Sequence, residues 1–235
     1  MRLFELAVAT WVFGHVLDFD ISYKAFLESV GGTLDLADPE HRNAMLVWLN
    51  KWGCRQFALA YHGEASDQIG AWYGERHGDL PTAERNLWEL TGEELHAVTR
   101  AYDNLASRRA SERIGTGGVR IGPTGAAKIL FAARPRALPP WDDPIRRKLG
   151  FTGSPASYRA FLDDVRRCVD DLASECQRHG LRLDELPHRL GRPLSTVPKL
   201  VDEYYWVTLT RKCKLPDKAT VQEWGRWAAR SGLEP

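Results

Sequence analysis

The chain has 235 residues, of which 43% are hydrophobic and 27% charged, and its net charge is +1. These values are ordinary for a folded soluble protein with enough residues for one large domain or two small lobes. No segment is long and apolar enough to cross a bilayer, which excludes a membrane-spanning protein. The net charge argues neither for nor against a nucleic-acid partner.

Cysteine and histidine spacing argues against a metal site. The cysteines form no C-x-x-C pair and no spacing typical of zinc or an iron–sulfur cluster. The seven histidines show no H-E-x-x-H or related spacing. We therefore expect a cytoplasmic protein with reduced thiols and no catalytic metal.

Two helices are predicted near the start of the chain. Residues 3–16 form an apolar run that loosely resembles a signal peptide. Glu5 interrupts this run and no small-residue cleavage site follows, so we expect a buried helix instead. Residues 38–52 begin with Asp38 before Pro39, which is a cap followed by proline at the first helical position.

Two longer helices are predicted in the middle of the chain. Residues 91–107 open with the capping box Thr91-x-x-Glu94. Residues 154–180 begin with Ser154 before a proline and repeat apolar residues at helical spacing.

The last part of the chain is also predicted to be helical. Residues 195–213 and 217–232 have the pattern of two more helices. Few alternating runs anywhere are long enough for strands. The sequence therefore predicts an all-α fold of about ten short helices.

The glycine-rich segment "RIGTGGVRIGPTG", residues 113–125, lies between a helix that ends near 108 and a predicted helix over 126–134. A tight turn here would point the backbone N–H groups of the second helix at a phosphate oxygen. The glycine spacing fits neither phosphate-loop pattern, and no strand precedes it, so a nucleoside triphosphate site is not expected.

Positive charge is concentrated around this turn. Residues 108–148 hold ten basic and three acidic residues, a net charge of +7, which leaves the rest of the chain at −6. A phosphate-binding surface needs such a concentration, whereas the alternative is a solvated basic stretch without a partner. The glycines and carboxylates within the segment favour phosphate binding.

Residues 139–150, "PPWDDPIRRKLG", place two adjacent carboxylates at the start of a short cationic helix. Asp143 directly precedes Pro144 and is predicted to cap this helix. Asp142 is then one residue too early to cap, which leaves it free for chemistry. Trp141 beside it could form a pocket wall.

Residues 121–142, "IGPTGAAKILFAARPRALPPWD", resemble without a gap the helix-hairpin-helix superfamily of DNA glycosylases, which includes the endonuclease III-like, alkyladenine and oxoguanine glycosylases. The family pattern is a hairpin of the form L-P-G-(V/I)-G, a helix, and a V-D-(T/Y)-H-V segment with the catalytic aspartate. Gly122 falls on the second hairpin glycine, Ala126 on the small helix residue and Asp142 on the catalytic aspartate.

The chain departs from the family pattern at several positions. Arg120 stands where the first hairpin glycine is expected, and Asp143-Pro144 replaces the usual Thr-His or Tyr-His pair. Thr124 occupies the position of the Schiff-base lysine of bifunctional members, which suggests a monofunctional enzyme. Lys128 lies one helical turn further on, on the same helix face, and its long side chain could lean back.

The resemblance implies a two-lobed helical fold, with a helix-hairpin-helix DNA-binding element and the active-site cleft between the lobes. One lobe would comprise residues 1–38 and 136–235, and the other residues 39–135. The implied enzyme is a monomer that needs no cofactor and acts on double-stranded DNA with a modified or damaged base. The residues expected to bind DNA are Gly118, Arg120, Gly122, Thr124, Gly125 and Lys128.

Cleavage of a base from its deoxyribose needs a fixed carboxylate and a pocket. Positive charge develops on the sugar, and Asp142 is the carboxylate expected to stabilise it and to orient water. The base must leave the stack, so an aromatic or apolar pocket and a wedge side chain are expected. The candidates for the pocket or the wedge are Trp141, Asp143, Asn50, Trp52, Tyr204, Tyr205 and Trp206. Each of these residues has a second interpretation. For Asp143 it is the helix cap, and for the others it is an ordinary position in the core or in solvent.

Three other functions remain open from the sequence. The first is a non-catalytic DNA-binding protein that kept the hairpin. The second is a bifunctional glycosylase and lyase that uses Lys128. The third is an all-α protein-interaction domain without nucleic acid.

Overall fold

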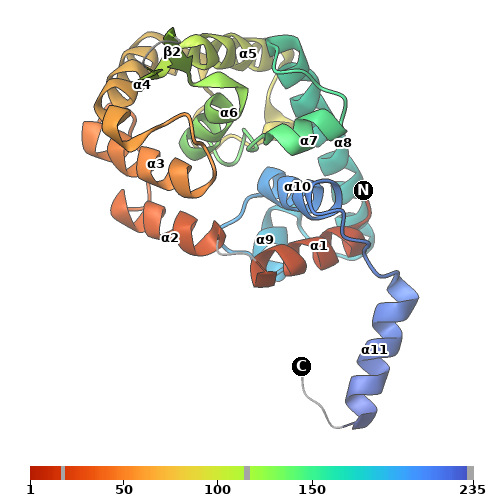
Figure 1. The fold of residues 1–235 in the computed structure, drawn as a ribbon. Helices are drawn as coiled ribbons and strands as arrows, with labels where there is room; N and C mark the ends of the chain where they lie inside the picture. The colour runs from red at the N-terminus through yellow and green to blue at the C-terminus, as the bar shows by residue number, and fades with distance from the viewer. Residues whose placement is uncertain (17–18, 114–116, 232–235) are drawn as a thin grey trace.

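The computed structural model describes residues 1–16, 19–113 and 117–231. They form eleven α-helices and one two-stranded sheet, which confirms the predicted all-α class (Figure 1). No described helix is long and apolar enough to cross a membrane. The α-helices are α1 (Leu3–Val16), α2 (Phe19–Ser29), α3 (Pro39–Lys51), α4 (His62–Arg76), α5 (Gly92–Ser107), α6 (Gly122–Ala133), α7 (Asp143–Lys148), α8 (Pro155–Arg178), α9 (Leu186–Arg189), α10 (Val197–Tyr205) and α11 (Lys218–Ser231).

The predicted helix starts are confirmed at atomic detail. The Asp38 carboxylate accepts from the Glu40 backbone N–H at 2.8 Å and caps α3. Thr91 and Glu94 form the reciprocal capping box of α5. Ser154 accepts from the N–H three residues on and caps α8. These local bonds satisfy N–H groups that the first helical turn leaves without partners.

The helices pack around one apolar core. The apolar stripe predicted in α8 is buried, and Tyr158 from it stacks on Tyr102 of α5 with ring centroids 4.0 Å apart. Figure 1 shows α3 to α6 on one side of the molecule and α1, α9 and α10 on the other. α11 extends away from both groups. The predicted lobes, 1–38 with 136–235 and 39–135, stay a prediction.

The segment between α5 and α6 differs from the predicted tight turn. Strands β1 (Arg109–Arg113) and β2 (Gly117–Arg120) pair antiparallel, and residues 114–116 between them lie outside the described residues. β1 packs on α4. A Cβ at Gly118 would lie 2.8 Å from the Arg109 Nε, so this strand position brings the arginine side chain close to the backbone. The connection is therefore a short β-hairpin, which four- and five-residue strands without clear alternation did not reveal.

Candidate functional site

Aromatic and charged side chains from both ends of the chain meet at one small pocket. Its volume is about 20 Å³, enough for a single water molecule. We call it the aromatic pocket; its lining residues are Phe13, Phe19, Trp52, Lys128, Asp142, Lys199, Asp202 and Trp206.

Asp142 stands at the entrance to α7, one position closer to the helix start than the sequence predicted. Asp142 occupies the N-cap position with extended backbone (φ −81°, ψ 151°), and Asp143 is the first helical residue. The prediction that Asp143 caps the helix is wrong, because its carboxylate pairs instead with Arg146 and Arg147 on the same helix. The Asp142 side chain makes no capping bond. Its Oδ1 points to Lys128, 2.7 Å from the ammonium Nζ.

Lys128 is buried beneath Asp142 and does not face solvent. Its side chain is only 4% exposed, and Nζ also donates to the Trp52 carbonyl at 2.7 Å. Burial acts to lower the pKa of Lys128, but the Asp142 carboxylate, together with Cys54 and Asp202, outweighs it, so the pKa is raised. Lys128 is therefore an ammonium that fixes Asp142, and the prediction that it contacts phosphate is wrong.

The close packing of α6 against the core explains why Lys128 is buried beneath Asp142. Gly122 begins the helix with φ +68°, a conformation that glycine adopts without strain. Gly125 lies against Gln56, where a Cβ would come within 2.6 Å of the amide nitrogen. From Gly125 to Ala133 every residue of α6 is buried. The helix is thus pressed into the core, and its one lysine must pair inside it.

A second lysine–aspartate pair closes the other side of the aromatic pocket. Lys199 Nζ lies 2.6 Å from the Asp202 carboxylate, and both side chains are less than a tenth exposed. Lys199 also lies over the Phe13 ring, 4.4 Å from its centroid. Burial raises the pKa of Asp202 to about 6. The sequence analysis missed this pair, because a Lys-x-x-Asp spacing on a helix usually marks a solvated surface pair.

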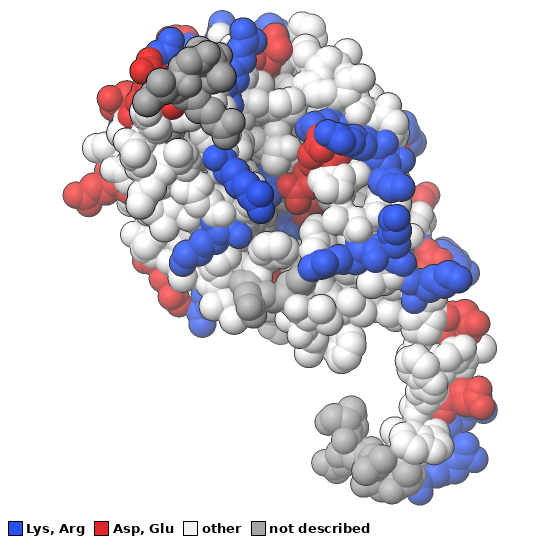
Figure 2. Space-filling model, viewed as in Figure 1, with Lys and Arg blue, Asp and Glu red and all other residues white. Residues whose placement is uncertain are grey.

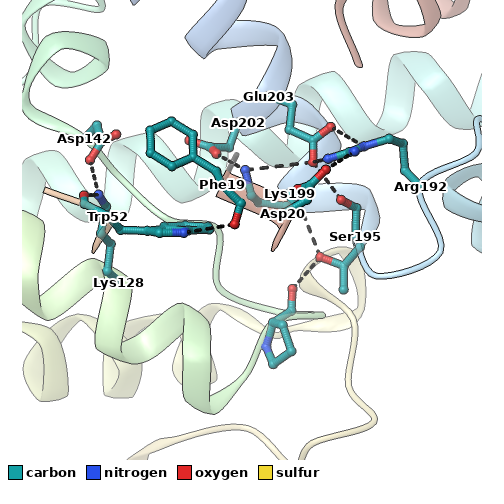
Figure 3. Close-up of polar contacts among 12 residues, drawn as sticks. Phe19, Asp20, Trp52, Lys128, Asp142, Arg192, Ser195, Lys199, Asp202 and Glu203 are labelled. Carbon is teal, nitrogen blue, oxygen red and sulfur yellow. Dashed lines mark hydrogen bonds and ion pairs between the residues drawn. The ribbon is translucent and has the colours of Figure 1, made fainter. Parts of the chain in front are cut away.

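An ion network continues from Lys199 away from Asp142 (Figure 3). Glu203 is fully buried and accepts two bonds from the Arg192 guanidinium, at 3.0 and 3.1 Å. Arg192 also pairs with Asp20 at the start of α2, and Ser195 donates to Glu203. This network ties α2 and α10 to the loop that follows α9.

The predicted aromatic candidates divide into two groups. Trp52 and Trp206 line the aromatic pocket. Tyr204 lines a different groove, and Tyr205 donates its hydroxyl to Asp164 at 2.9 Å. Trp141 is fully buried and stacks on Phe161 in the core, so its predicted place as a pocket wall is wrong.

Two other predicted contacts have structural partners. Asn50 bonds through its amide to the His62 ring at 2.9 Å, away from the aromatic pocket. Gly125 is buried and serves packing, so it has no surface to offer DNA. Gly118 and Arg120 on the hairpin are exposed, while Gly122 and Thr124 are half-buried at the start of α6.

The face that holds the aromatic pocket carries charge of both signs. Figure 2 shows a hollow with acidic side chains inside it and Lys and Arg side chains on both sides. Within the basic segment 108–148, the ion-paired members are Arg108, Arg109, Lys128, Arg146 and Arg147. Two of these pairs, Arg108 with Glu75 and Arg109 with Glu64, use carboxylates from outside the segment, so they balance two of its seven net positive charges.

Among the described residues, no group of three or more His, Cys, Asp or Glu side chains could hold a metal ion. Comparisons with protein-family models, with curated proteins and with solved structures found no match for this chain. The chemistry of the aromatic pocket is therefore the evidence that bears on the function of this protein.

Proposed function

We propose that the protein is a monofunctional DNA glycosylase that hydrolyses the bond between a modified base and its deoxyribose. The observation that carries the proposal is the exposure, pairing and position of the Asp142 carboxylate. This carboxylate is 26% exposed, is held by one buried ammonium, and lines a pocket walled by four aromatic rings. The family resemblance of residues 121–142 supports the same assignment.

Asp142 would act on the sugar of the extruded nucleotide. Positive charge develops at the anomeric carbon as the base leaves, and a fixed carboxylate stabilises it. Lys128 is the positioning residue, because its two bonds at 2.7 Å fix both Asp142 and the backbone at Trp52. The volume of the aromatic pocket suits one water, which the carboxylate can orient for attack.

The base itself needs more room than the aromatic pocket provides. A neighbouring cavity of about 150 Å³ shares Trp52 and Lys199 with it. A cavity of this volume can hold a benzene-sized ring. Movement of the Trp52 side chain would join the two spaces and let its indole stack on the base. The substrate we propose is double-stranded DNA in the cytoplasm, and the protein would act on it as a monomer.

The proposal is tested by incubating the protein with duplexes that each carry one modified base. Alkali would cleave the abasic product, and mass spectrometry would identify the released base. One free base, absent when Asp142→Asn replaces the wild type, is the expected result. Release of no base from any of these duplexes would contradict the proposal.

A bifunctional glycosylase and lyase is the second candidate. The observation that favours it is the 2.7 Å contact between Lys128 Nζ and Asp142, since the carboxylate could take a proton from the ammonium. The raised pKa of Lys128 opposes it, because only the neutral amine attacks the sugar. Borohydride trapping on substrate DNA distinguishes the two: a covalent adduct that Lys128→Met removes would establish the lyase.

A further inference from the structure

The C-terminal segment, residues 211–230, carries positive charge that ion pairs among the described residues do not neutralise. It holds six basic residues and only two acidic ones. None of the six forms an ion pair with a carboxylate in the part of the chain that the structure describes, whereas half of the basic residues in 108–148 do. Unpaired charge produces a long-range field, so this segment attracts an anionic partner.

The segment begins at the wall of the aromatic pocket. The Arg211 guanidinium lies over the Trp206 ring, 4.6 Å from its centroid, and Trp206 lines the pocket. The backbone turns at Lys212, whose φ of +56° makes it the one non-glycine residue with positive φ among those described. From there the chain continues to α11, which projects from the body (Figure 1).

One face of α11 carries positive charge that suits a nucleic acid. At 3.6 residues per turn, Lys218, Arg226 and Arg230 fall within about a third of the helix circumference. Trp224 and Trp227 lie on nearly the opposite face of the helix and are 59% and 58% exposed. The helix has 14 residues and is about 21 Å long. A DNA duplex carries about a dozen phosphate charges over that length.

A second copy of the chain is a poorer partner for this helix. The large groove at the base of α11 is lined by Arg2, Arg178 and Arg189, together with leucines. Of its acidic lining residues, Glu5 and Glu175 already pair with two of those arginines, and Asp217 belongs to the C-terminal segment itself. The groove therefore offers no surplus acid to a basic helix.

We infer that residues 211–230 form a second DNA-binding arm, which grips the phosphate backbone beside the nucleotide that enters the aromatic pocket. This inference rests on the proposed function, since it takes DNA as the substrate. The arm supplies affinity through phosphate contacts. It takes no part in the cleavage chemistry.

The test measures the affinity of the full chain for an unmodified 20-base-pair duplex as potassium chloride is varied. The variant replaces Lys218, Arg226 and Arg230 with Gln. The control replaces Arg100, Arg167 and Arg182 with Gln, which makes the same charge change on the body, where all three already pair with carboxylates. The slope of log Kd against log salt should fall by about three in the arm variant. Affinity at 0.15 M salt should fall about tenfold or more in that variant, and neither value should change much in the control.

A separate readout distinguishes this inference from the proposed function. Single-turnover excision at saturating protein should be unchanged in the arm variant, because the arm only binds. Equal DNA affinity and salt slope in the two variants would overturn the arm while leaving excision intact. DNA binding that depends on the arm, with no base released from any modified duplex, would support the arm and contradict the glycosylase. Loss of a dimer in sedimentation, without loss of DNA affinity, would show that α11 binds a second copy instead.

Discussion

Two lysine–aspartate pairs face the same aromatic pocket, and they differ in what surrounds the carboxylate. In both, the lysine is buried and lies about 5.5 Å from the Trp52 ring centroid. The Asp142 side chain is 26% exposed and has one charged partner, whereas Asp202 is 8% exposed and lies beside Glu203. One carboxylate can reach a substrate, and the other cannot.

The difference in solvent exposure between Asp142 and Asp202 matches a difference in role. One carboxylate can react with a substrate, and the other holds helices in place. A partly exposed carboxylate held at one point can approach a sugar without breaking the fold. A buried carboxylate joined to a network of further charges fixes the positions of α2 and α10. Similar pairs of side chains therefore perform different tasks, because their surroundings differ in solvent access.

The largest expected difference between the two lysine–aspartate pairs is in the free energy of unfolding. Lys199→Met leaves Asp202 and Glu203 buried together with only Arg192 to balance them, and should lower the free energy of unfolding by about 3–5 kcal/mol. Lys128→Met leaves Asp142 with a quarter of its side chain still exposed to water and should cost less, about 1–3 kcal/mol. Urea denaturation of both variants measures the difference. Equal losses would show that exposure does not distinguish the pairs.

A smaller effect is expected in the pH dependence of stability. Burial raises the pKa of Asp202 to about 6, above its value near 4 in the unfolded chain. The folded state therefore binds this proton more tightly, so the stability it contributes is present below about pH 4 and is lost as the pH rises to about 6. Relative to Asp202→Asn, the wild type should lose about 2 kcal/mol across that range. A difference that stays constant from pH 4 to 7 would contradict this account of Asp202.

The smallest effect concerns Lys128 as a positioning residue. Lys128→Met should lower single-turnover excision about tenfold, equivalent to about 1.4 kcal/mol, with DNA affinity unchanged. Lys128→Arg keeps the charge and should recover part of the rate, whereas a role in packing alone predicts more recovery with Met than with Arg. A complete loss of excision in Lys128→Met would instead favour a nucleophilic lysine.

Much of the local structure was predictable from the sequence, because it depends on neighbours along the chain. The caps at Asp38, Thr91 and Ser154 follow from hydrogen bonds to N–H groups two or three residues away. The pairing of Lys128 with Asp142 was not predicted, because helical spacing showed only that Lys128 shares a helix face with Thr124. The error at Asp143 arose because a proline is accepted at the second helical position as well as the first, which moves the cap back by one residue.

What the sequence did not reveal depends on contacts between distant segments. Lys199 and Asp202 have a spacing that suits a surface pair, and only the packing of α10 against Phe13 and Trp52 buries them. Trp52 and Trp206 were distinguished from Trp141 only by the fold. Glu64 and Glu75, which come from α4, balance two of the seven net positive charges of segment 108–148, and the sequence could not show these pairs.

The most direct test of the account compares Asp142→Asn with Asp143→Asn in single-turnover excision on the modified duplex that the wild type cleaves. The adjacent substitutions remove the same charge from the same helix start, but Asp143 pairs only with Arg146 and Arg147. We expect Asp142→Asn to lose at least about a thousandfold in rate while still binding DNA, and Asp143→Asn to stay within about threefold of the wild type. Equal activity of the two variants would contradict the central role of Asp142.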